Sequence, residues 1–232
     1  MRKSKRSAWK LSNQIYMGNV KALSYSEMSL FWEDRDEWRK RYIDGVKSEG
    51  TKPQQLGIII HEFMETRDMA VAVLKLGELG LPGRQLETVK RMLKQAWKLP
   101  LTKKCEHKSL VTLPNGEKLF MVYDGFDPEL RFITEYKTGN TDRYWNQNVV
   151  DGNEQLSFYA FGYYLDTRQF LRGMVVYAMN TTTGLIKAYP TTRGPMDLKV
   201  IADKIGTTID RMQELDLWQK RISGKIRATV GV

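Results

Sequence analysis

Residues 123–139 read YDGFDPELRFITEYKTG, and this stretch decides the fold. Two largely apolar runs flank an Asp-Pro-Glu turn at 127–129, and Asp124 lies at the end of the first run. Glu135 and Lys137 lie two apart in the second run. Residues two apart in a strand project from the same face. The stretch therefore predicts two adjacent strands, with Glu135 and Lys137 side by side and Asp124 brought beside them by the turn.

Two carboxylates and one ammonium group at a sheet edge form a hard-cation site with a built-in positive charge. Phosphodiester cleavage needs such an arrangement. The alternative is a surface salt bridge, which is common on strands and contributes only about 0–1 kcal/mol. The apolar neighbours of Asp124 and Glu135 favour the metal site, because charged residues are seldom placed among buried ones without a partner or a role.

The composition describes a soluble globular protein of 232 residues, with 41% hydrophobic and 28% charged residues. This length fits one large domain. Neither a long apolar span nor a secretory signal is expected, since no apolar segment follows the basic start at 1–6. The single cysteine, Cys105, excludes an intramolecular disulfide and favours a reducing cytoplasm.

The net charge of +10 arises from 37 Lys and Arg against 27 Asp and Glu residues. Such a balance favours a polyanionic partner, because neutralising phosphates releases counterions from nucleic acid. A membrane surface would be a competing partner. However, no segment combines a strong apolar face with a dense basic face, so no membrane partner is expected.

The order of the predicted elements indicates the fold class. Helices are predicted first, from the capping box at Ser24 to about 42, from near Pro53, and over 84–98. Strands at 109–113, 118–123 and 131–137 follow, then a helix over 155–165, strands at 173–179 and 184–189, and a last helix from 195. We therefore predict one α/β domain, with a central mixed β-sheet flanked by helices and an N-terminal helical elaboration.

From the residues alone, a structural role is favoured for both histidines. His61 lies in the apolar helix segment IIIHEFM, where a lone histidine is more often structural than a ligand. Residue 65 is a glutamate, so the His-Glu-x-x-His pattern of zinc proteases is excluded. His107 has no obvious partner and is interpreted as structural.

Gln155 and Tyr159 are four residues apart and therefore lie on one face of the helix that follows the catalytic strand. They either satisfy buried backbone groups or hydrogen-bond a phosphate or the lysine. The residues alone leave both interpretations open.

Four motifs in order resemble the PD-(D/E)XK nuclease superfamily, most closely its RecB-like exonuclease branch, which includes CRISPR-associated RecB-type nucleases. The motifs span about residues 24–190 and are Ser24–Phe31, Gly57–Glu62, Asp124–Asp127 with Ile133–Gly139, and Gln155–Tyr159. The resemblance implies a single restriction-endonuclease-like domain.

The resemblance also implies the roles of individual residues. A divalent metal, Mg²⁺ or Mn²⁺, would be bound by Asp124, Glu135, the backbone carbonyl of Tyr136 and the imidazole of His61. Lys137 would activate the attacking water or stabilise the developing charge. Gln155 and Tyr159 would hold the substrate strand or the lysine.

One departure from the family pattern concerns iron. Several RecB-type nucleases hold an iron–sulfur cluster with one upstream cysteine and three near the C-terminus, whereas residues 217–227 contain none. We therefore expect no iron–sulfur cluster, as in members that resemble phage-encoded nucleases. The expected function is a metal-dependent DNA exonuclease of phage or bacterial recombination or repair, in the cytoplasm of a bacterial or phage-infected cell. The alternatives are a structure-specific, flap-type endonuclease and a catalytically silent DNA-binding recombination accessory.

The expected DNA contacts lie in the loop after the catalytic strand, where Arg143, Tyr144 and Trp145 could grip a strand or stack on a base. Packing of Trp145 under the loop is an equal alternative. The predicted organisation is a basic arm over 1–20 and a nuclease domain over 21–232. Its parts are a helical cap over 21–103 that contributes His61, a catalytic sheet and helix over 104–192, and a C-terminal helix and tail over 193–232. A homo-oligomer or a recombination partner protein would be compatible with this class.

Overall fold

The computed structural model describes residues 22–46, 50–140 and 144–215. The chain divides into two compact units, each built from separate stretches of sequence. Of the described residues, the first comprises 22–46, 109–121 and 199–215, and the second comprises 50–108, 122–140 and 144–198. The predicted basic arm over 1–20 lies outside the described residues, and the other predicted boundaries stay predictions.

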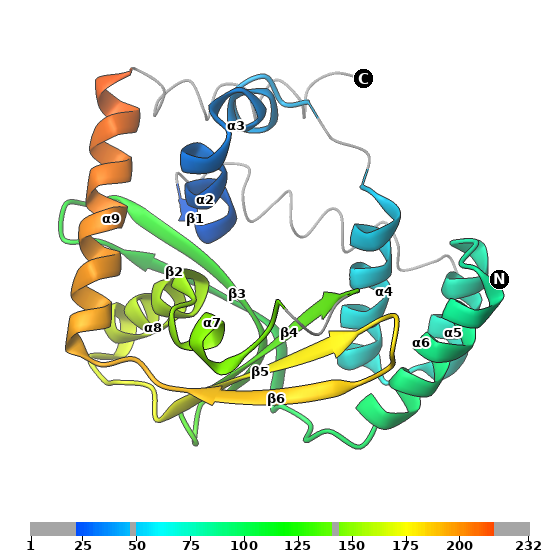
Figure 1. The fold of residues 1–232 in the computed structure, drawn as a ribbon. Helices are drawn as coiled ribbons and strands as arrows, with labels where there is room; N and C mark the ends of the chain where they lie inside the picture. The colour runs from blue at the N-terminus through cyan, green and yellow to red at the C-terminus, as the bar shows by residue number, and fades with distance from the viewer. Residues whose placement is uncertain (1–21, 47–49, 141–143, 216–232) are drawn as a thin grey trace, which may run out of the picture. The chain divides into compact units, whose positions relative to one another are not determined.

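A mixed β-sheet forms the framework, as the sequence predicts (Figure 1). In the second unit β4 (Phe132–Gly139) pairs antiparallel with β3 (Lys118–Asp127) and parallel with β5 (Gly173–Asn180). The edge strand β6 (Ile186–Thr191) is antiparallel to β5. In addition, β2 (Lys104–Thr112) pairs with β3, and the predicted hairpin turn at 114–116 connects them.

Strand β4 presents different chemistry on its two faces. Tyr136 is buried in an apolar core with Met179 and three helices, α4 (Lys52–Thr66), α5 (Met69–Glu78) and α6 (Gly83–Ala96). Because side chains alternate along a strand, Glu135 and Lys137 project from the opposite face. There they contact α8 (Glu154–Thr167). The strand therefore separates an apolar face from a polar one.

Helix α4 is placed by its own sequence. A capping box between Thr51 and Gln54, with a proline in the first turn, begins the helix. A Cβ atom added to Gly57 would lie 3.1 Å from Thr138 Oγ1 of β4. The glycine thus allows α4 to approach the sheet closely, and His61 follows it by one helical turn.

The crossover from β4 to β5 contains α7 (Gln147–Asp151) and α8, joined by a tight bend. The buried guanidinium of Arg193 fixes this bend, because its five donated hydrogen bonds reach both helices and the segment after β6. The acceptors are the carbonyl oxygens of Val150, Asn153 and Thr192 and the hydroxyl oxygens of Ser157 and Thr191. Arg193 therefore fixes the start of α8.

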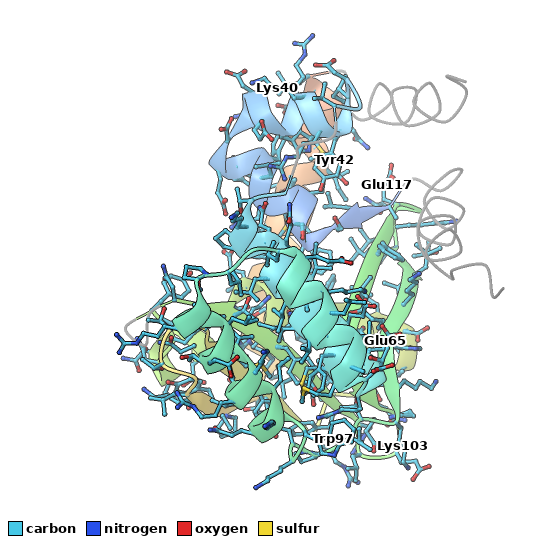
Figure 2. The ribbon with its side chains drawn as sticks, turned by 90° about the vertical axis from the view of Figure 1, so that its right-hand side faces the viewer. Lys40, Tyr42, Glu65, Trp97, Lys103 and Glu117 are labelled. Carbon is cyan, nitrogen blue, oxygen red and sulfur yellow. The ribbon has the colours of Figure 1, made fainter. Side chains whose placement is uncertain are left out.

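The first unit contains α2 (Tyr25–Glu33), α3 (Arg35–Tyr42), the short strand β1 (Leu23–Ser24) and α9 (Pro195–Glu214) from residue 199 onward. Trp38 is buried and stacks on Tyr42, with ring centroids 6.4 Å apart; Tyr42 is labelled in Figure 2. The prediction of one helix over 24–42 is wrong. Asp34 adopts an extended conformation and its side chain accepts a hydrogen bond from the Glu37 amide, which begins a second helix.

The other predicted helices and strands are present, with ends that differ by a few residues. Two helices, α5 and α7, were not predicted. Within the described ranges, no helix is both long enough and apolar enough to cross a bilayer.

Candidate active site

The antiparallel ladder between β3 and β4 ends where Gly125 lies opposite Thr134. One residue beyond, Asp124 Oδ2 accepts a hydrogen bond of 2.7 Å from the Tyr136 amide. The Asp124 carboxylate thus accepts the hydrogen bond that a backbone carbonyl of β3 would accept if the ladder continued. Since the N–H and C=O of one strand residue point to the same side, the Tyr136 carbonyl also faces this opening.

A glycine is required beside Asp124. A Cβ atom at Gly125 would lie 2.5 Å from the side chain of Thr102, too close for any other residue without displacement of the neighbouring chain. Gly125 therefore permits the close packing that places Asp124 at the end of the ladder.

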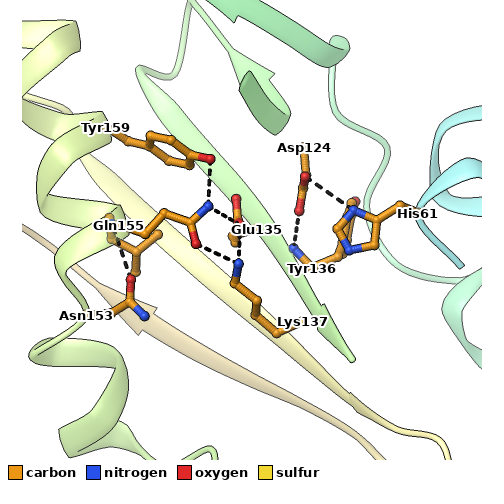
Figure 3. A network of polar contacts seen from close by, with 9 residues as sticks. His61, Asp124, Glu135, Tyr136, Lys137, Asn153, Gln155 and Tyr159 are labelled. Atoms are coloured by element: carbon orange, nitrogen blue, oxygen red, sulfur yellow. Dashed lines mark hydrogen bonds and ion pairs between the residues drawn. The ribbon is translucent and has the colours of Figure 1, made fainter. Parts of the chain in front are cut away.

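On one side of Asp124, four predicted residues form a continuous polar network (Figure 3). Lys137 Nζ lies 2.7 Å from Glu135 Oε1 and donates to Gln155 Oε1 at 2.7 Å. The Gln155 amide nitrogen donates to Glu135 Oε1 at 3.0 Å and to the Tyr159 hydroxyl at 2.7 Å. Glu135 is only 2% exposed, and its second oxygen, Oε2, has no hydrogen-bond partner among the described residues.

On the other side of Asp124 lies the imidazole of His61. Its Nδ1 is 3.3 Å from Asp124 Oδ1, and its ring meets the Tyr136 ring edge-on at 6.1 Å. Burial lowers the pKa of His61, but the hydrogen bond and charge of Asp124 outweigh burial, so the pKa is raised above the usual value. His61 and Asp124 are thus adjacent.

A third acidic residue, Glu106 on β2, lies in the same place and was not predicted. One ligand atom each of His61, Glu106 and Asp124 lies within 4.8 Å of the others. Glu135 does not belong to this compact group. The metal ligands expected from the resemblance, His61 with Asp124 and Glu135, stay a prediction.

The pKa values of the two glutamates at the site are raised. Burial, followed by the charge of Asp124, raises the pKa of Glu135, although Lys137 lowers it in part. Burial and then Asp124 raise the pKa of Glu106 to about 7. Burial also raises the pKa of Tyr159, so its hydroxyl stays protonated. Carboxyl groups with a raised pKa are difficult to ionise, and a bound cation would stabilise their ionised form.

Little in the sequence could have identified Glu106. It lies in the segment KCEHK, which lacks an alternating apolar pattern, and the strand was predicted to begin only at 109. Its neighbour His107 stacks on Phe126, with centroids 5.0 Å apart, as the structural interpretation of that histidine requires.

The predicted DNA-contact residues are partly described. Tyr144 is 62% exposed, and its ring meets that of Trp145 edge-on. The Trp145 carbonyl accepts a hydrogen bond of 2.9 Å from the Tyr189 hydroxyl, and Trp145 lines a shallow hollow with Tyr189 and Lys187. Arg143 lies outside the described residues.

Comparisons with known proteins establish the fold. No family model and no curated protein sequence matches this chain. The structure is similar to the crystal structure of a protein from Eubacterium rectale named "Putative exonuclease", with a TM-score of 0.58 and 12% sequence identity. The similarity covers 97% of this chain and 88% of that one. The chain therefore shares with that protein a mixed α/β fold, in which helices flank a central mixed sheet.

Proposed function

We propose that this protein is a metal-dependent nuclease that hydrolyses phosphodiester bonds in DNA from an end. The observation that carries the proposal is the arrangement of Asp124, Glu135 and Lys137 where β3 and β4 separate, with a buried oxygen of Glu135 left without a partner. The fold shared with a protein named an exonuclease supports it.

The residues at this position fit a divalent cation. Asp124, Glu135 and the Tyr136 carbonyl supply the oxygen ligands that Mg²⁺ and Mn²⁺ prefer, and the imidazole of His61 shifts the preference toward Mn²⁺. When bound, the cation supplies Lewis-acid polarisation of a phosphoryl oxygen and lowers the pKa of a bound water.

The protein's own groups then orient the reaction. Glu135 and Gln155 hold the Lys137 ammonium group in one place, so its charge can stabilise an oxygen that becomes more negative in the transition state. Tyr159 fixes the amide orientation of Gln155, because its hydroxyl accepts from the amide nitrogen. Lys137 therefore needs little reorganisation during the reaction.

The substrate and the biological setting are part of the same proposal. The net charge of +10 and the exposed ring of Tyr144 favour a DNA strand that passes beside the end of β4, with Trp145 as a second stacking group. The four sequence motifs favour the RecB-like branch and a role in phage or bacterial DNA recombination or repair, in the cytoplasm.

The test uses end-labelled linear DNA and covalently closed circular DNA with Mg²⁺, Mn²⁺ or EDTA. We expect linear DNA to be degraded only with metal and circles to survive. Lys137→Ala should reduce the rate by at least about 100-fold, because electrostatic groups of this kind contribute roughly 10²–10³.

Lys90→Ala is the matched control, since Lys90 lies on α6 and, among the described residues, forms its ion pair with Glu87 of the same helix. Cleavage of the circles would replace the exonuclease by an endonuclease on the same site. DNA binding without metal-dependent cleavage would contradict the nuclease and favour a silent recombination accessory.

A further inference from the structure

Strand pairing places a second lysine in the same row of the sheet as Lys137. Strands β4, β5 and β6 lie side by side in that order (Figure 1). Lys137 of β4 is paired with Ala178 of β5, and Ala178 is paired with Lys187 of β6. Paired residues project from the same face of a sheet, so Lys187 lies on the face that carries Glu135 and Lys137. Because neighbouring strands are about 4.8 Å apart, the backbones of β4 and β6 are about 10 Å apart in this row.

The ammonium group of Lys187 can accept a ligand from solvent. Lys187 is exposed, and its side chain forms no hydrogen bond or ion pair with any residue in the described part of the chain. Lys137, in contrast, is held by Glu135 and Gln155 at 2.7 Å each. One lysine is therefore fixed at the proposed reaction centre, and the other is free to contact a second anionic group on the same face.

The surface between the two lysines carries no bulky side chain. Ala178 lies between them, and Gly139 is two residues beyond Lys137 on the same face. A Cβ atom added to Gly139 would meet no described atom within 4 Å outside its chain neighbours, so the space above this residue is open. The Gly139 carbonyl accepts from both the amide and the hydroxyl of Thr181, which fixes the end of β4. A rigid, open floor therefore leads from Lys137 toward Lys187.

An aromatic residue borders this floor. Trp145 lines the same shallow hollow as Lys187 and the floor residues. The Tyr189 hydroxyl donates to the Trp145 carbonyl at 2.9 Å, which fixes the backbone of Trp145 to β6. Proteins bind unpaired nucleic-acid strands with cationic grooves and aromatic side chains, because every base has a face on which a ring can stack. The hollow therefore combines the two kinds of group that such a strand requires.

We propose that Gly139, Trp145, Ala178 and Lys187 form a subsite for one unpaired DNA strand. Lys187 binds the phosphate next to the one that is cleaved, and Trp145 stacks on the adjacent base. This inference rests on the proposed nuclease function and deepens it, because it assigns single-stranded DNA to the site as its substrate. Bases within a duplex have both faces covered by their neighbours, so only an unpaired base offers a face to Trp145. A double-stranded end would have to separate before it is cleaved.

The test measures binding of a fluorescent single-stranded DNA oligonucleotide by anisotropy, in EDTA and at a series of KCl concentrations. Each phosphate contact with a single strand contributes about 0.7 to the slope of log affinity against log salt concentration, so Lys187→Gln should reduce this slope by about 0.7. Trp145→Ala should weaken binding by about tenfold or more without a change in slope, because a stacked base contributes affinity that does not depend on salt. A blunt duplex should bind equally well to Trp145→Ala and to the unaltered chain.

A third variant tests the open floor. Gly139→Val fits the strand, because the position has room for a Cβ atom and β-branched residues are favoured in strands. Its side chain would fill the space beside Trp145, so we expect weaker binding of the single strand. Lys98→Gln is the matched control for Lys187→Gln, since Lys98 is an exposed lysine that follows α6, and it should keep the slope of the unaltered chain.

An unchanged slope in Lys187→Gln would overturn the subsite and leave Lys187 as an edge-strand lysine that prevents pairing with another chain. Equal losses of single-strand and duplex binding in Trp145→Ala would overturn the preference for an unpaired strand, and unaltered binding by Gly139→Val would overturn the path along the floor. Failure of the nuclease proposal is distinguishable, because binding in EDTA requires no cleavage. It would appear as a reduced slope in Lys187→Gln without any Lys137-dependent degradation of DNA.

Discussion

At the scale of single residues, Gln155 connects the parts of the candidate site. Its amide oxygen accepts from Lys137, and its amide nitrogen donates to both Glu135 and Tyr159. Only a side chain with a donor and an acceptor at its tip can serve all of these partners. Gln155 is therefore a positioning residue for Lys137.

We expect Gln155→Leu to lower kcat about 10–100-fold with little change in KM for DNA. The lost hydrogen bonds to charged groups contribute roughly 1.5–3 kcal/mol, and 1.4 kcal/mol corresponds to a factor of ten. Steady-state kinetics on linear DNA measures this, with Gln169→Leu, an exposed glutamine beyond the end of α8, as the control. An equal rise in KM and no fall in kcat would show that Gln155 binds substrate instead of positioning the lysine.

The sequence predicted some residues of the candidate site and missed one of them. Asp124, Glu135 and Lys137 were predictable because strand alternation and one turn determine their proximity, and the helical spacing of Gln155 and Tyr159 predicted a shared face. Glu106 was not, because its position depends on a left-handed backbone and on pairing between β2 and β3. Neither feature leaves a periodic pattern in the chain.

At the scale of elements, the bend between α7 and α8 is held by one side chain. Arg193 is 6% exposed and donates to carbonyl groups at the end of α7 and the start of α8. A cation at the C-terminal end of a helix is also favourable for the helix dipole. The position of Gln155, two residues after the Asn153 cap of α8, therefore depends on Arg193.

We expect Arg193→Met to lower the free energy of unfolding by at least about 3 kcal/mol. The substitution leaves several buried acceptors unsatisfied, at roughly 1–3 kcal/mol each. Urea unfolding followed by circular dichroism gives the value, and Arg172→Met, at an exposed arginine, should cost under about 0.5 kcal/mol. Similar losses in the two variants would contradict the role given to Arg193.

The helices and strands with strong local signals were predictable, and those defined by tertiary contacts were not. Prolines near their starts predicted α4 and α9, a cap before residue 155 predicted α8, and an Asn-Gly turn predicted the β2–β3 hairpin. The five-residue helix α7 lies in a polar segment whose ends are fixed by Arg193 and by the Asn146 cap. Its sequence alone resembles a loop.

At the scale of the whole molecule, charge links stability to pH. The folded pKa of Glu106, about 7, and that of Glu135 both exceed the ordinary value of a glutamate. Between about pH 4.5 and 7 the folded chain therefore binds more protons than the unfolded chain, so these groups make stability fall as pH rises. His61, whose folded pKa is also raised, acts in the same direction, since its stabilising pairing is lost above that pKa.

We expect Mn²⁺ to reverse this loss, because it binds carboxylates and imidazole without their protons. Saturation at about 100 times the dissociation constant contributes about 2.7 kcal/mol, or roughly 5–10 °C in Tm for a chain of this size. The increase in Tm over an EDTA sample should be small at pH 5.5 and large at pH 8. Asp124→Asn should abolish it, and an equal increase at both pH values would exclude these carboxylates as the ligands.

The fold class was predictable at this scale, because the order of helices and strands with one mixed sheet permits few arrangements. The assembly of two compact units from interleaved stretches was not, since β2, β3 and α9 each run from one unit into the other. The local sequence pattern of a strand does not indicate to which compact unit each of its residues belongs.

The carboxylate that ends the β3–β4 ladder also has a spectroscopic consequence. The Tyr136 amide proton is bonded to Asp124 Oδ2, whereas its neighbours along the strand bond to peptide carbonyls. Its nuclear magnetic resonance frequency must therefore follow the electron density on that carboxylate. One backbone signal thus reports, without a label at the site, whether Asp124 is protonated, ionised or shared with a cation.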